Sequence, residues 1–313
     1  MTRVAAIDCG TNSIRLLVAD ADPETGELVD LDRRMEIVRL GQGVDRTGRL
    51  APEALARTFA ACRQYAEVIK EHGAERVRFV ATSASRDAEN RDEFVRGVLD
   101  ILGVEPEVIS GDQEAEFSFT GATKELQGRA DLQTPYLVVD LGGGSTEFVV
   151  GSDRVRAARS VDVGCVRMTE RHLVRGGVVT DPPTAEQIAA IRADVEAALD
   201  LAEETVPLRE ARTLVGLAGT VTTVAAIALG LDTYDWTAIH HARIPYEQVS
   251  EVVDRLVHAT HAERAAIPVM HPGRVDVIAA GALVLLAIMD RIGAREVVVS
   301  EHDILDGIGW SVA

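Results

Sequence analysis

The chain has 313 residues, of which 47% are hydrophobic and 4% aromatic, so a globular core here has to be aliphatic. This length allows one large domain or two ordinary ones. The formal net charge of −18 excludes a general nucleic-acid binder, which needs a basic surface to neutralise phosphates.

The first third of the chain predicts an antiparallel hairpin followed by alternating helices and strands. Val4–Ile7 is apolar and β-prone, Cys9–Ser13 is a turn, and Ile14–Ala19 returns as a strand. The elements expected next are one or two strands in Leu28–Leu40, a helix in Glu53–His72, a strand in Arg76–Ala81, a helix in Arg91–Leu102 and a short strand in Pro106–Ile109. A hairpin that leads into βαβ units is typical of the α/β class.

The pattern of the N-terminus then restarts. Tyr136–Asp140 is apolar, Leu141–Ser145 is rich in glycine and Thr146–Gly151 is apolar again. At a spacing of 132 residues the two copies align Asp8 with Asp140, Gly10 with Gly142, and Ser13 with Ser145. Because the same polar positions recur inside the same apolar frame, we interpret the chain as a duplication with a junction near Gly121–Thr134.

The second copy continues with further helices and strands. The expected elements are a helix at Thr184–Glu203, a strand at Thr213–Leu217, a helix at Val249–His258, a long apolar helix at Val275–Ile292, a strand at Glu296–Ser300 and a helix at Ile304–Val312. The strand at Thr213–Leu217 runs into a small-residue helix that contains Gly219 and Thr220. Such a helix start can present backbone N–H groups to an anion.

The doubled Asp-x-Gly-x-x-Ser turn is the first candidate site. A lone glycine-rich hairpin is usually only a turn, but two facing copies would form a phosphate clamp, because glycine exposes N–H groups without a blocking Cβ. The candidate phosphate contacts are Asp8, Gly10, Thr11, Asn12, Ser13, Gly142, Gly143, Gly144, Ser145 and Thr146. Asp8 and Asp140, at the strand ends, could hold Mg²⁺ directly or through water.

The run Asp140–Glu147 is the most specific single motif. Three consecutive glycines in a hairpin cost conformational entropy, and close approach of a ligand is the usual reason for them. Glu147 on the returning strand could assist the metal or the attacking water. A solvated strand residue is the alternative interpretation.

A candidate general base follows from helix capping. Ser110 and Gln113 have the spacing of a capping box, which would place Glu114 in the first helical turn. There the helix field favours an ionised carboxylate, which could take a proton from water. From the residues alone a helix-dipole role for Glu114 is the simpler interpretation, and Glu116 competes as the base.

Two arginines are candidate anion contacts. Arg86 ends a hydroxyl-rich stretch, Thr82–Arg86, after a strand, which is where an open α/β sheet binds anions. A surface ion pair is an equally simple role for Arg86. Arg39 is a similar but weaker candidate.

Other chemistries lack their motifs. The three cysteines form no C-x-x-C pair, so a disulfide framework or thiolate metal site is not expected. His240, His241 and His271 lack metal-ligand spacing and are expected to be structural or surface residues. There is no G-x-S-x-G elbow and no P-loop. With no signal-peptide pattern and no apolar run near 18 residues, we expect a soluble cytoplasmic protein that contacts no membrane.

Six ordered motifs resemble one known family. They are Val4–Val18, Ala81–Asn90, Ile109–Glu116, Val138–Glu147, Gly216–Thr223 and Asp276–Leu283, and they cover nearly the whole chain. Together they resemble the exopolyphosphatase/guanosine pentaphosphate phosphatase family, which has the actin-like ATPase fold. The resemblance implies an α/β protein of two duplicated actin-like (ribonuclease H-like) domains with an interdomain cleft. Their expected bounds are 1–124, completed by a helix at about 303–313, and 125–302.

The resemblance also implies an activity. Glu114 aligns with the family's catalytic glutamate, which places it ahead of Glu116, while Asp140 and Glu147 align with acids near the Mg²⁺ and the water. Arg86 aligns with a substrate-contacting arginine, and Asp8, Gly142–Gly144 and Ser145 align with phosphate-binding positions. The implied enzyme hydrolyses inorganic polyphosphate or guanosine pentaphosphate with Mg²⁺, or with Mn²⁺ as a substitute. Family members often pair, so a homodimer is implied as well.

Two departures from the family pattern bear on these expectations. The helical C-terminal extension of long members is missing, which puts processivity on long polyphosphate in doubt. Val299–Gly307 stands where many members carry a Trp-Gly-Leu-Arg-Glu-Gly-like stretch, so an arginine is lost and contacts from that loop differ. A kinase of the same fold and a non-catalytic sensor of polyphosphate or guanosine polyphosphates are the rival functions.

Overall fold

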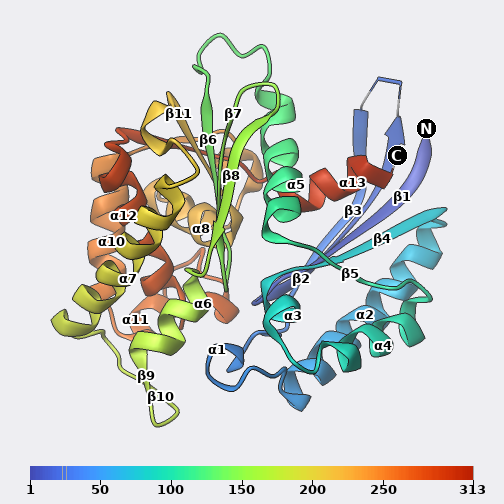
Figure 1. Ribbon diagram of the computed structural model, residues 1–313, viewed down its shortest axis with the longest axis horizontal. Helices are drawn as coiled ribbons and strands as arrows, with labels where there is room; N and C mark the ends of the chain where they lie inside the picture. The colour runs from blue at the N-terminus through green and yellow to red at the C-terminus, as the bar shows by residue number, and fades with distance from the viewer. Residues whose placement is uncertain (23, 26, 313) are drawn as a thin grey trace. The chain divides into compact units, whose positions relative to one another are not determined.

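Two compact units make up the chain in the computed structural model, which describes residues 1–22, 24, 25 and 27–312 (Figure 1). Unit 1 comprises Met1–Gly121 and Asp303–Ala313, and unit 2 comprises Ala122–His302. Each unit is built on one large mixed sheet. The chain passes from unit 1 to unit 2 inside α5 (Gly111–Thr123) and returns to unit 1 for its last helix.

Unit 1 has a five-stranded sheet in the order β3-β2-β1-β4-β5. Its strands are β1 (Thr2–Cys9), β2 (Ser13–Asp22), β3 (Glu27–Ile37), β4 (Arg76–Ala81) and β5 (Glu107–Val108). The first three strands pair antiparallel, whereas β4 pairs parallel with β1 and β5 parallel with β4. The predicted hairpin is confirmed, and the predicted segment Leu28–Leu40 forms a single strand that ends at Ile37.

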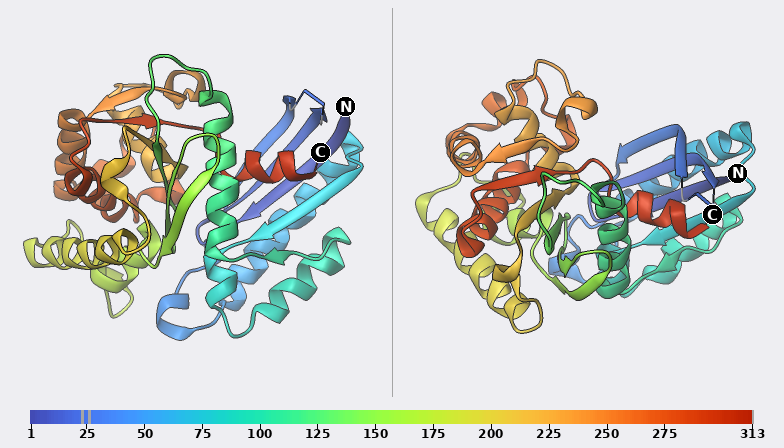
Figure 2. Two further views of the ribbon diagram at one scale, coloured as in Figure 1. Left: turned by 45° about the horizontal axis from the view of Figure 1, so that its top comes forward. Right: turned by 90° about the horizontal axis from the view of Figure 1, so that it is seen from above.

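Helices cover both faces of this sheet (Figure 2). They are α1 (Val44–Thr47), α2 (Pro52–His72), α3 (Ser83–Asp87), α4 (Arg91–Leu102), α5 and α13 (Ile304–Val312). Along β1, Ala5 and Ile7 pack in the cluster with α2 and α4, while Val4 and Ala6 pack in the cluster with α13. Because side chains alternate between the faces and both faces are covered, β1 is apolar at every one of these positions.

Unit 2 repeats this topology. Its main sheet has the order β12-β13-β11-β6-β7-β8. The strands are β6 (Tyr136–Leu141), β7 (Thr146–Gly151), β8 (Val155–Val161), β11 (Thr213–Leu217), β12 (Arg243–Pro245) and β13 (Glu296–Val299), with β9 (Val174–Arg175) and β10 (Val178–Val179) in a small separate sheet. An antiparallel set, β6–β8, again continues into parallel strands, β11 and β13. The duplication is therefore confirmed, with β12 added at one edge.

The core of unit 2 is built around α12 (Ile278–Ile292), as its apolar sequence predicts. Every residue from Ile278 to Met289 is buried, which is typical of a helix inside a core. The other helices are α6 (Cys165–Met168), α7 (Ala185–Glu203), α8 (Ala218–Ala228), α9 (Trp236–Ile239), α10 (Tyr246–His258) and α11 (His261–Ala265). In the described part of the chain, no helix is both long and apolar enough to cross a membrane.

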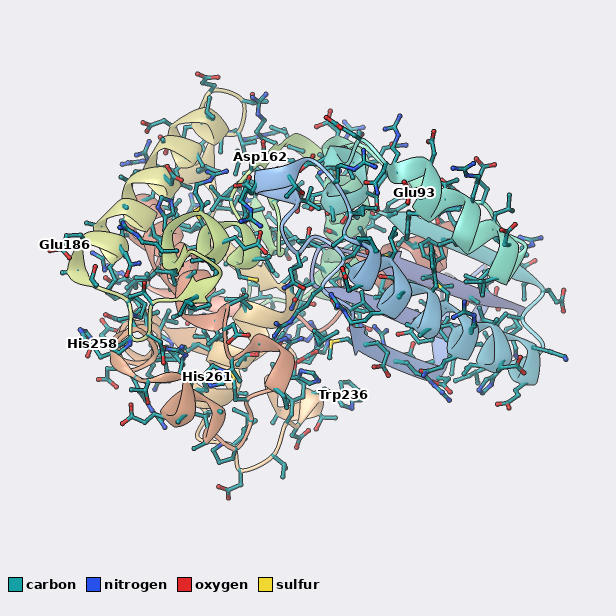
Figure 3. All side chains as sticks on the ribbon, turned by 90° about the horizontal axis from the view of Figure 1, so that it is seen from below. Glu93, Asp162, Glu186, Trp236, His258 and His261 are labelled. Atoms are coloured by element: carbon teal, nitrogen blue, oxygen red, sulfur yellow. The ribbon has the colours of Figure 1, made fainter. Side chains whose placement is uncertain are left out.

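The sequence pattern misses most of the short elements. These are α1, α3, α6, α9, α11, β9, β10 and β12, which have five residues or fewer, together with β8. Periodicity needs more residues than these helices contain. Trp236, the first residue of α9, is 57% exposed (Figure 3), so α9 does not begin with a buried apolar residue that could mark it.

Candidate functional site

The two glycine turns close in the same way. In unit 1 the Gly10 N–H donates to the Ser13 carbonyl oxygen at 2.9 Å, and in unit 2 the Gly142 N–H donates to the Ser145 carbonyl oxygen at 3.0 Å. A Cβ at Gly10 would meet no heavy atom nearer than 3.6 Å. Packing within unit 1 therefore does not require glycine at position 10, and close approach of a ligand is a common reason for such a glycine.

In unit 1 the segment after β3 binds the carbonyl groups of the turn. The Thr11 carbonyl oxygen accepts from the Gly41 N–H at 2.8 Å, and the Asn12 carbonyl oxygen accepts from the Arg39 N–H at 2.8 Å. Gly41 is required there, because a Cβ would lie 2.3 Å from Thr11 Cγ2. With these carbonyl groups engaged, the turn can present its N–H groups other than that of Gly10 to an anion.

In unit 2 the start of α6 donates hydrogen bonds to the carbonyl groups of the triple glycine. Three carbonyl oxygens of the turn accept hydrogen bonds, Gly142 from the Cys165 N–H at 3.0 Å, Gly143 from the Val166 N–H at 2.9 Å, and Gly144 from Arg167 Nε at 2.6 Å. Both copies of the turn are thus held by their carbonyl side. The groups left to serve an anion are again backbone N–H groups.

Gly164, just before α6, lets this contact form, and its substitution should distort the turn. A Cβ at Gly164 would lie 2.4 Å from the Gly143 carbonyl oxygen and 2.7 Å from the Gly144 nitrogen. Because both are backbone atoms, Gly164→Ala should lower the free energy of unfolding in urea by about 2 kcal/mol, the typical cost of overpacking. Gly10→Ala is the matched control, since its Cβ has room, and should cost under about 1 kcal/mol. Equal urea midpoints for Gly164→Ala and the parent would contradict this.

A third segment joins the turn of unit 1 at the same edge of the sheet. The Thr82 N–H, between β4 and α3, donates to the Cys9 carbonyl oxygen at 3.2 Å. The Thr11 and Ser83 hydroxyls share a buried hydrogen bond of 2.8 Å. The predicted hydroxyl-rich stretch after β4 therefore lies beside the predicted glycine turn.

In unit 2 the matching segment is the start of α8. Leu217 is the register partner of Asp140 in the parallel pair β11–β6, so α8 begins beside Asp140. Ala218 has a φ of 69°, which is rare for a residue other than glycine. Strained backbone at a strand end is a pointer to function, and here it precedes the predicted anion contacts Gly219 and Thr220.

Arg274 also lies at this helix start, and the sequence analysis missed it. A Cβ at Gly219 would lie 2.4 Å from Arg274 Cζ, so the guanidinium lies against the Gly219 backbone. Arg274 Nη1 donates to Thr223 Oγ1 at 3.1 Å. A guanidinium at a helix N-terminus is suited to a phosphate group. The available signal was its place two residues before the motif Asp276–Leu283.

The aspartate at the end of each first strand has a different cross-strand partner. Asp8 faces Arg15, whose Nη2 lies 2.7 Å from Asp8 Oδ2. Burial raises the pKa of Asp8, and the charge of Arg15 opposes this rise. Asp140 instead faces Glu147, which also accepts from the Ser160 hydroxyl at 2.6 Å. Asp140 and Glu147 are 7% and 1% exposed, so two buried carboxylates oppose each other in unit 2.

This difference bears on where a cation fits. Like charges directly opposite on paired strands are unfavourable, and a hard divalent cation with oxygen ligands offsets them. The pair Asp140 and Glu147 therefore fits Mg²⁺ by its chemistry. Asp8 already has a guanidinium partner within its own unit.

Glu114 is a buried carboxylate at the start of α5. The predicted capping box is present, since the Ser110 N–H donates to Gln113 Oε1 at 3.1 Å and the Gln113 N–H donates to Ser110 Oγ at 3.3 Å. Glu114 is 7% exposed, and Arg86 Nη1 donates to its Oε2 at 3.1 Å. Arg86 also donates to the Ile109 carbonyl oxygen at 2.9 Å, which fixes the guanidinium. Glu114 and Arg86, both predicted from the sequence, are thus in direct contact.

Two further predicted residues differ in their surroundings. Glu116, the competing base, is exposed to solvent. Thr146 is fully buried, and its hydroxyl donates to the Val163 carbonyl oxygen at 2.6 Å. A hydroxyl has one hydrogen, so the expected donation from Thr146 to a phosphate would compete with this bond.

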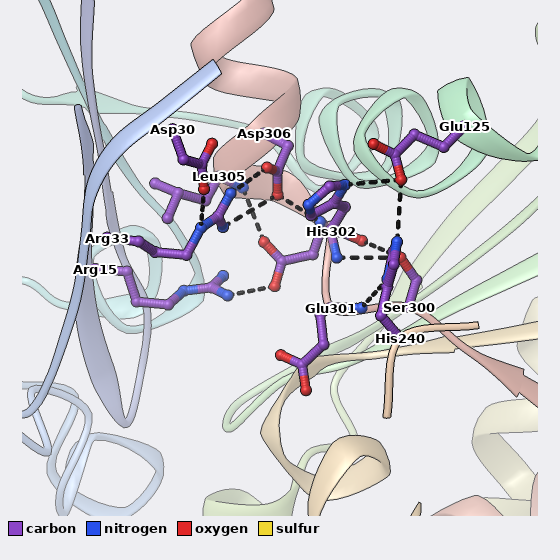
Figure 4. A network of polar contacts seen from close by, with 11 residues as sticks. Arg15, Asp30, Arg33, Glu125, His240, Ser300, Glu301, His302, Leu305 and Asp306 are labelled. Carbon is purple, nitrogen blue, oxygen red and sulfur yellow. Dashed lines mark hydrogen bonds and ion pairs between the residues drawn. The ribbon is translucent and has the colours of Figure 1, made fainter. Parts of the chain in front are cut away.

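The histidines form a hydrogen-bonded group in unit 2 (Figure 4). His240 Nδ1 accepts from the Glu301 N–H at 3.1 Å, so neutral His240 carries its proton on Nε2, which lies 3.0 Å from Glu125 Oε2. His302 Nδ1 lies 3.3 Å from the same oxygen. A metal ion on His240 Nε2 would require the proton on Nδ1, where it would face the Glu301 N–H. Hydrogen bonding explains this group better than metal ligation.

His241 next to this group should make stability depend on pH. Burial and the neighbouring His240 lower the pKa of His241 to about 4. The unfolded chain therefore binds more protons than the folded one between about pH 6.5 and pH 4, and stability should fall as pH falls through this window. His241→Asn, which tolerates the φ of 62° found there, should flatten this dependence in urea unfolding series. An unchanged slope would contradict the assignment.

Comparisons with known proteins identify the family. The Ppx/GppA phosphatase family model matches residues 17–311, and the chain belongs to this family. Exopolyphosphatase 2 of Mycobacterium tuberculosis is 54% identical over 324 aligned residues, which cover 100% of this chain and 99% of the relative.

Solved structures show the same fold. The crystal structure of an exopolyphosphatase-like protein has 46% sequence identity and a TM-score of 0.92, and covers 98% of this chain and 97% of its own. The Aquifex aeolicus member of the Ppx/GppA family has 31% identity and a TM-score of 0.78, with 99% and 97% covered. The predicted α/β class with a repeated sheet topology is confirmed.

Proposed function

We propose that this chain is an exopolyphosphatase, which hydrolyses the terminal phosphoanhydride bond of inorganic polyphosphate with Mg²⁺ and a water activated by Glu114. The observation that supports it most is that the buried Glu114 accepts a hydrogen bond from Arg86. The chain that carries this pair is 54% identical, over its whole length, to a protein named exopolyphosphatase 2. Family resemblance and site chemistry thus lead to the same reaction.

Phosphate binding in this proposal uses backbone N–H groups and arginines. The turn at Gly10–Ser13 and the turn at Gly142–Ser145 each have their carbonyl side engaged, so each offers N–H groups to phosphate oxygens. In unit 2, Gly219, Thr220 and Arg274 would add a helix start and a guanidinium. These groups stabilise negative charge without any proton transfer.

Asp140 and Glu147 would hold the Mg²⁺, with Mn²⁺ as a substitute. The support is their opposed position on β6 and β7 and their burial. When bound, the cation offsets negative charge on the transferring phosphoryl group. The Asp8 oxygen that Arg15 does not engage is a hydrogen-bond acceptor, so Asp8 would contact the bound phosphate through water.

Glu114 would act as the general base. One proton of the attacking water passes to the Glu114 carboxylate while the water oxygen forms a bond to the terminal phosphorus. The bridging P–O bond breaks, and its electron pair leaves with the shortened chain. A substrate phosphate that draws Arg86 toward itself would release Glu114 Oε2 from its ion pair, which couples substrate binding to an available base.

The net charge of −18 opposes long-range attraction of a polyanion. We propose that local cations overcome this, namely Arg86, Arg274 and the Mg²⁺, because salt screens distant acids over about 8–10 Å. Binding of polyphosphate should therefore tighten as ionic strength rises from very low values, before it weakens again. A steady weakening over the whole range would contradict this account.

A phosphate-release assay across four substrates tests the proposal. Long polyphosphate, short polyphosphate, guanosine pentaphosphate and ATP are each incubated with the enzyme and Mg²⁺. We expect phosphate from polyphosphate with water as the only acceptor. Release from guanosine pentaphosphate alone would favour the alternative 5′-phosphohydrolase. Turnover that requires an added acceptor would favour a kinase, and binding without any release would favour a sensor.

A further inference from the structure

Arg15 bridges two buried carboxylates in unit 1. It donates to Asp8 Oδ2 from Nε at 3.0 Å and from Nη2 at 2.7 Å, and its Nη1 donates to Asp303 Oδ2. Asp8 and Asp303 are 4% and 3% exposed. Within the described part of the chain, Asp8 Oδ1 accepts no side-chain hydrogen bond, so the bridge fixes the carboxylate and leaves one oxygen for a ligand.

Asp303 is itself held in one orientation. Its Oδ1 accepts from the Leu305 N–H at 3.0 Å, and its own N–H donates to Asp306 Oδ2 at 2.9 Å. Asp306 in turn pairs with Arg33 on β3 (Figure 4). Both Asp303 oxygens are engaged, so this carboxylate is a rigid anchor for Arg15.

The same segment packs directly on α5. A Cβ at Gly121 would lie 1.7 Å from the Asp303 carbonyl oxygen, and a Cβ at Gly307 would lie 2.1 Å from the Phe117 carbonyl oxygen. Only glycines allow the two backbones to come this close. α5 also carries Glu114, the proposed base. The segment at the start of α13 therefore contacts the helix of the base directly, and it reaches Asp8 at the glycine turn through Arg15.

We propose that Asp303 is a positioning residue for hydrolysis: it orients Arg15, Arg15 orients Asp8, and its backbone sets α5. This rests on the proposed function. It also gives a role to Val299–Gly307, the stretch in which this chain departs from the family pattern. Asp303 touches no substrate and acts through Arg15.

Three variants separate positioning from support of the fold. Asp303→Asn keeps the shape and removes the charge that anchors Arg15, whereas Asp303→Glu keeps the charge. Asp306→Asn is the control, because it removes an equally buried carboxylate from the same helical turn, and its amide oxygen can still accept the Asp303 N–H. Each is assayed for kcat and KM on polyphosphate and for hydrogen exchange.

We expect Asp303→Asn to lower kcat about 30-fold, because Asp8 and the glycine turn would be misplaced around the transferring phosphoryl group. Asp303→Glu should recover part of this loss, and Asp306→Asn should keep kcat within about threefold. Hydrogen exchange over residues 8–13 should be faster in Asp303→Asn than in Asp306→Asn, since the turn loses its anchor.

Two outcomes would overturn the inference. Equal losses of kcat in Asp303→Asn and Asp306→Asn, in step with stability, would show a purely structural role. Unchanged exchange over residues 8–13 in Asp303→Asn would show that the turn does not depend on Asp303. The exchange measurement needs no turnover, so it tests the inference even if the parent enzyme releases no phosphate. Absence of phosphate release would refute the proposed function and not this inference.

Discussion

Glu114→Gln should lower the turnover number on polyphosphate about 1,000-fold, within the range that a positioned general base supplies. Glutamine keeps the shape of the side chain and an oxygen that can accept from Arg86 Nη1, now 3.1 Å from Glu114 Oε2. It cannot take a proton from water. Substrate binding through the glycine turns should survive, so KM should stay within about threefold. Steady-state phosphate release gives both constants.

The matched control is Glu116→Gln. Glu116 lies on the same helix but is exposed, so its variant should keep the parent turnover number within about twofold. A turnover number for Glu114→Gln within a few-fold of the parent would show that another group takes the proton. A large loss in Glu116→Gln with none in Glu114→Gln would move the base two residues along α5.

Asp140→Asn should lower turnover about 100-fold and abolish the stabilisation that Mg²⁺ confers on the folded protein. Asp140 and Glu147 oppose each other across β6 and β7, and the loss of one carboxylate removes both a ligand and half of the charge that attracts the cation. For the parent, Mg²⁺ at about 100 times its Kd should add about 2.7 kcal/mol to the free energy of unfolding. Thermal unfolding with and without Mg²⁺ measures this without turnover.

Asp8→Asn tests the assignment of the metal to unit 2. Asp8 occupies the position equivalent to Asp140, but Arg15 already lies 2.7 Å from its carboxylate. The Mg²⁺-dependent rise in the midpoint of thermal unfolding should therefore persist in Asp8→Asn, although turnover falls. If the rise is lost in Asp8→Asn and kept in Asp140→Asn, the cation belongs to the turn of unit 1.

The tertiary structure changes the meaning of several motifs. Glu114 and Glu116 are competing acids on a predicted helix, and the structure separates them by the burial of Glu114 and its contact with Arg86. The duplicated aspartates look alike in sequence, yet their cross-strand partners differ in charge, Arg15 for Asp8 and Glu147 for Asp140. A pattern of residue types cannot show which residue lies opposite each aspartate, because the cross-strand partner depends on strand register.

What the sequence by itself determined is local. The hairpin turns, the capping box at Ser110 and the bounds of the long helices follow from propensity and apolar period, which act over a few residues. Only the tertiary structure decided three contacts between distant segments: Arg274 against Gly219, Gly164 against Gly143, and Arg15 with Asp303, 288 residues away. Each is a contact between elements, and its energy depends on burial and on distances that no local pattern contains.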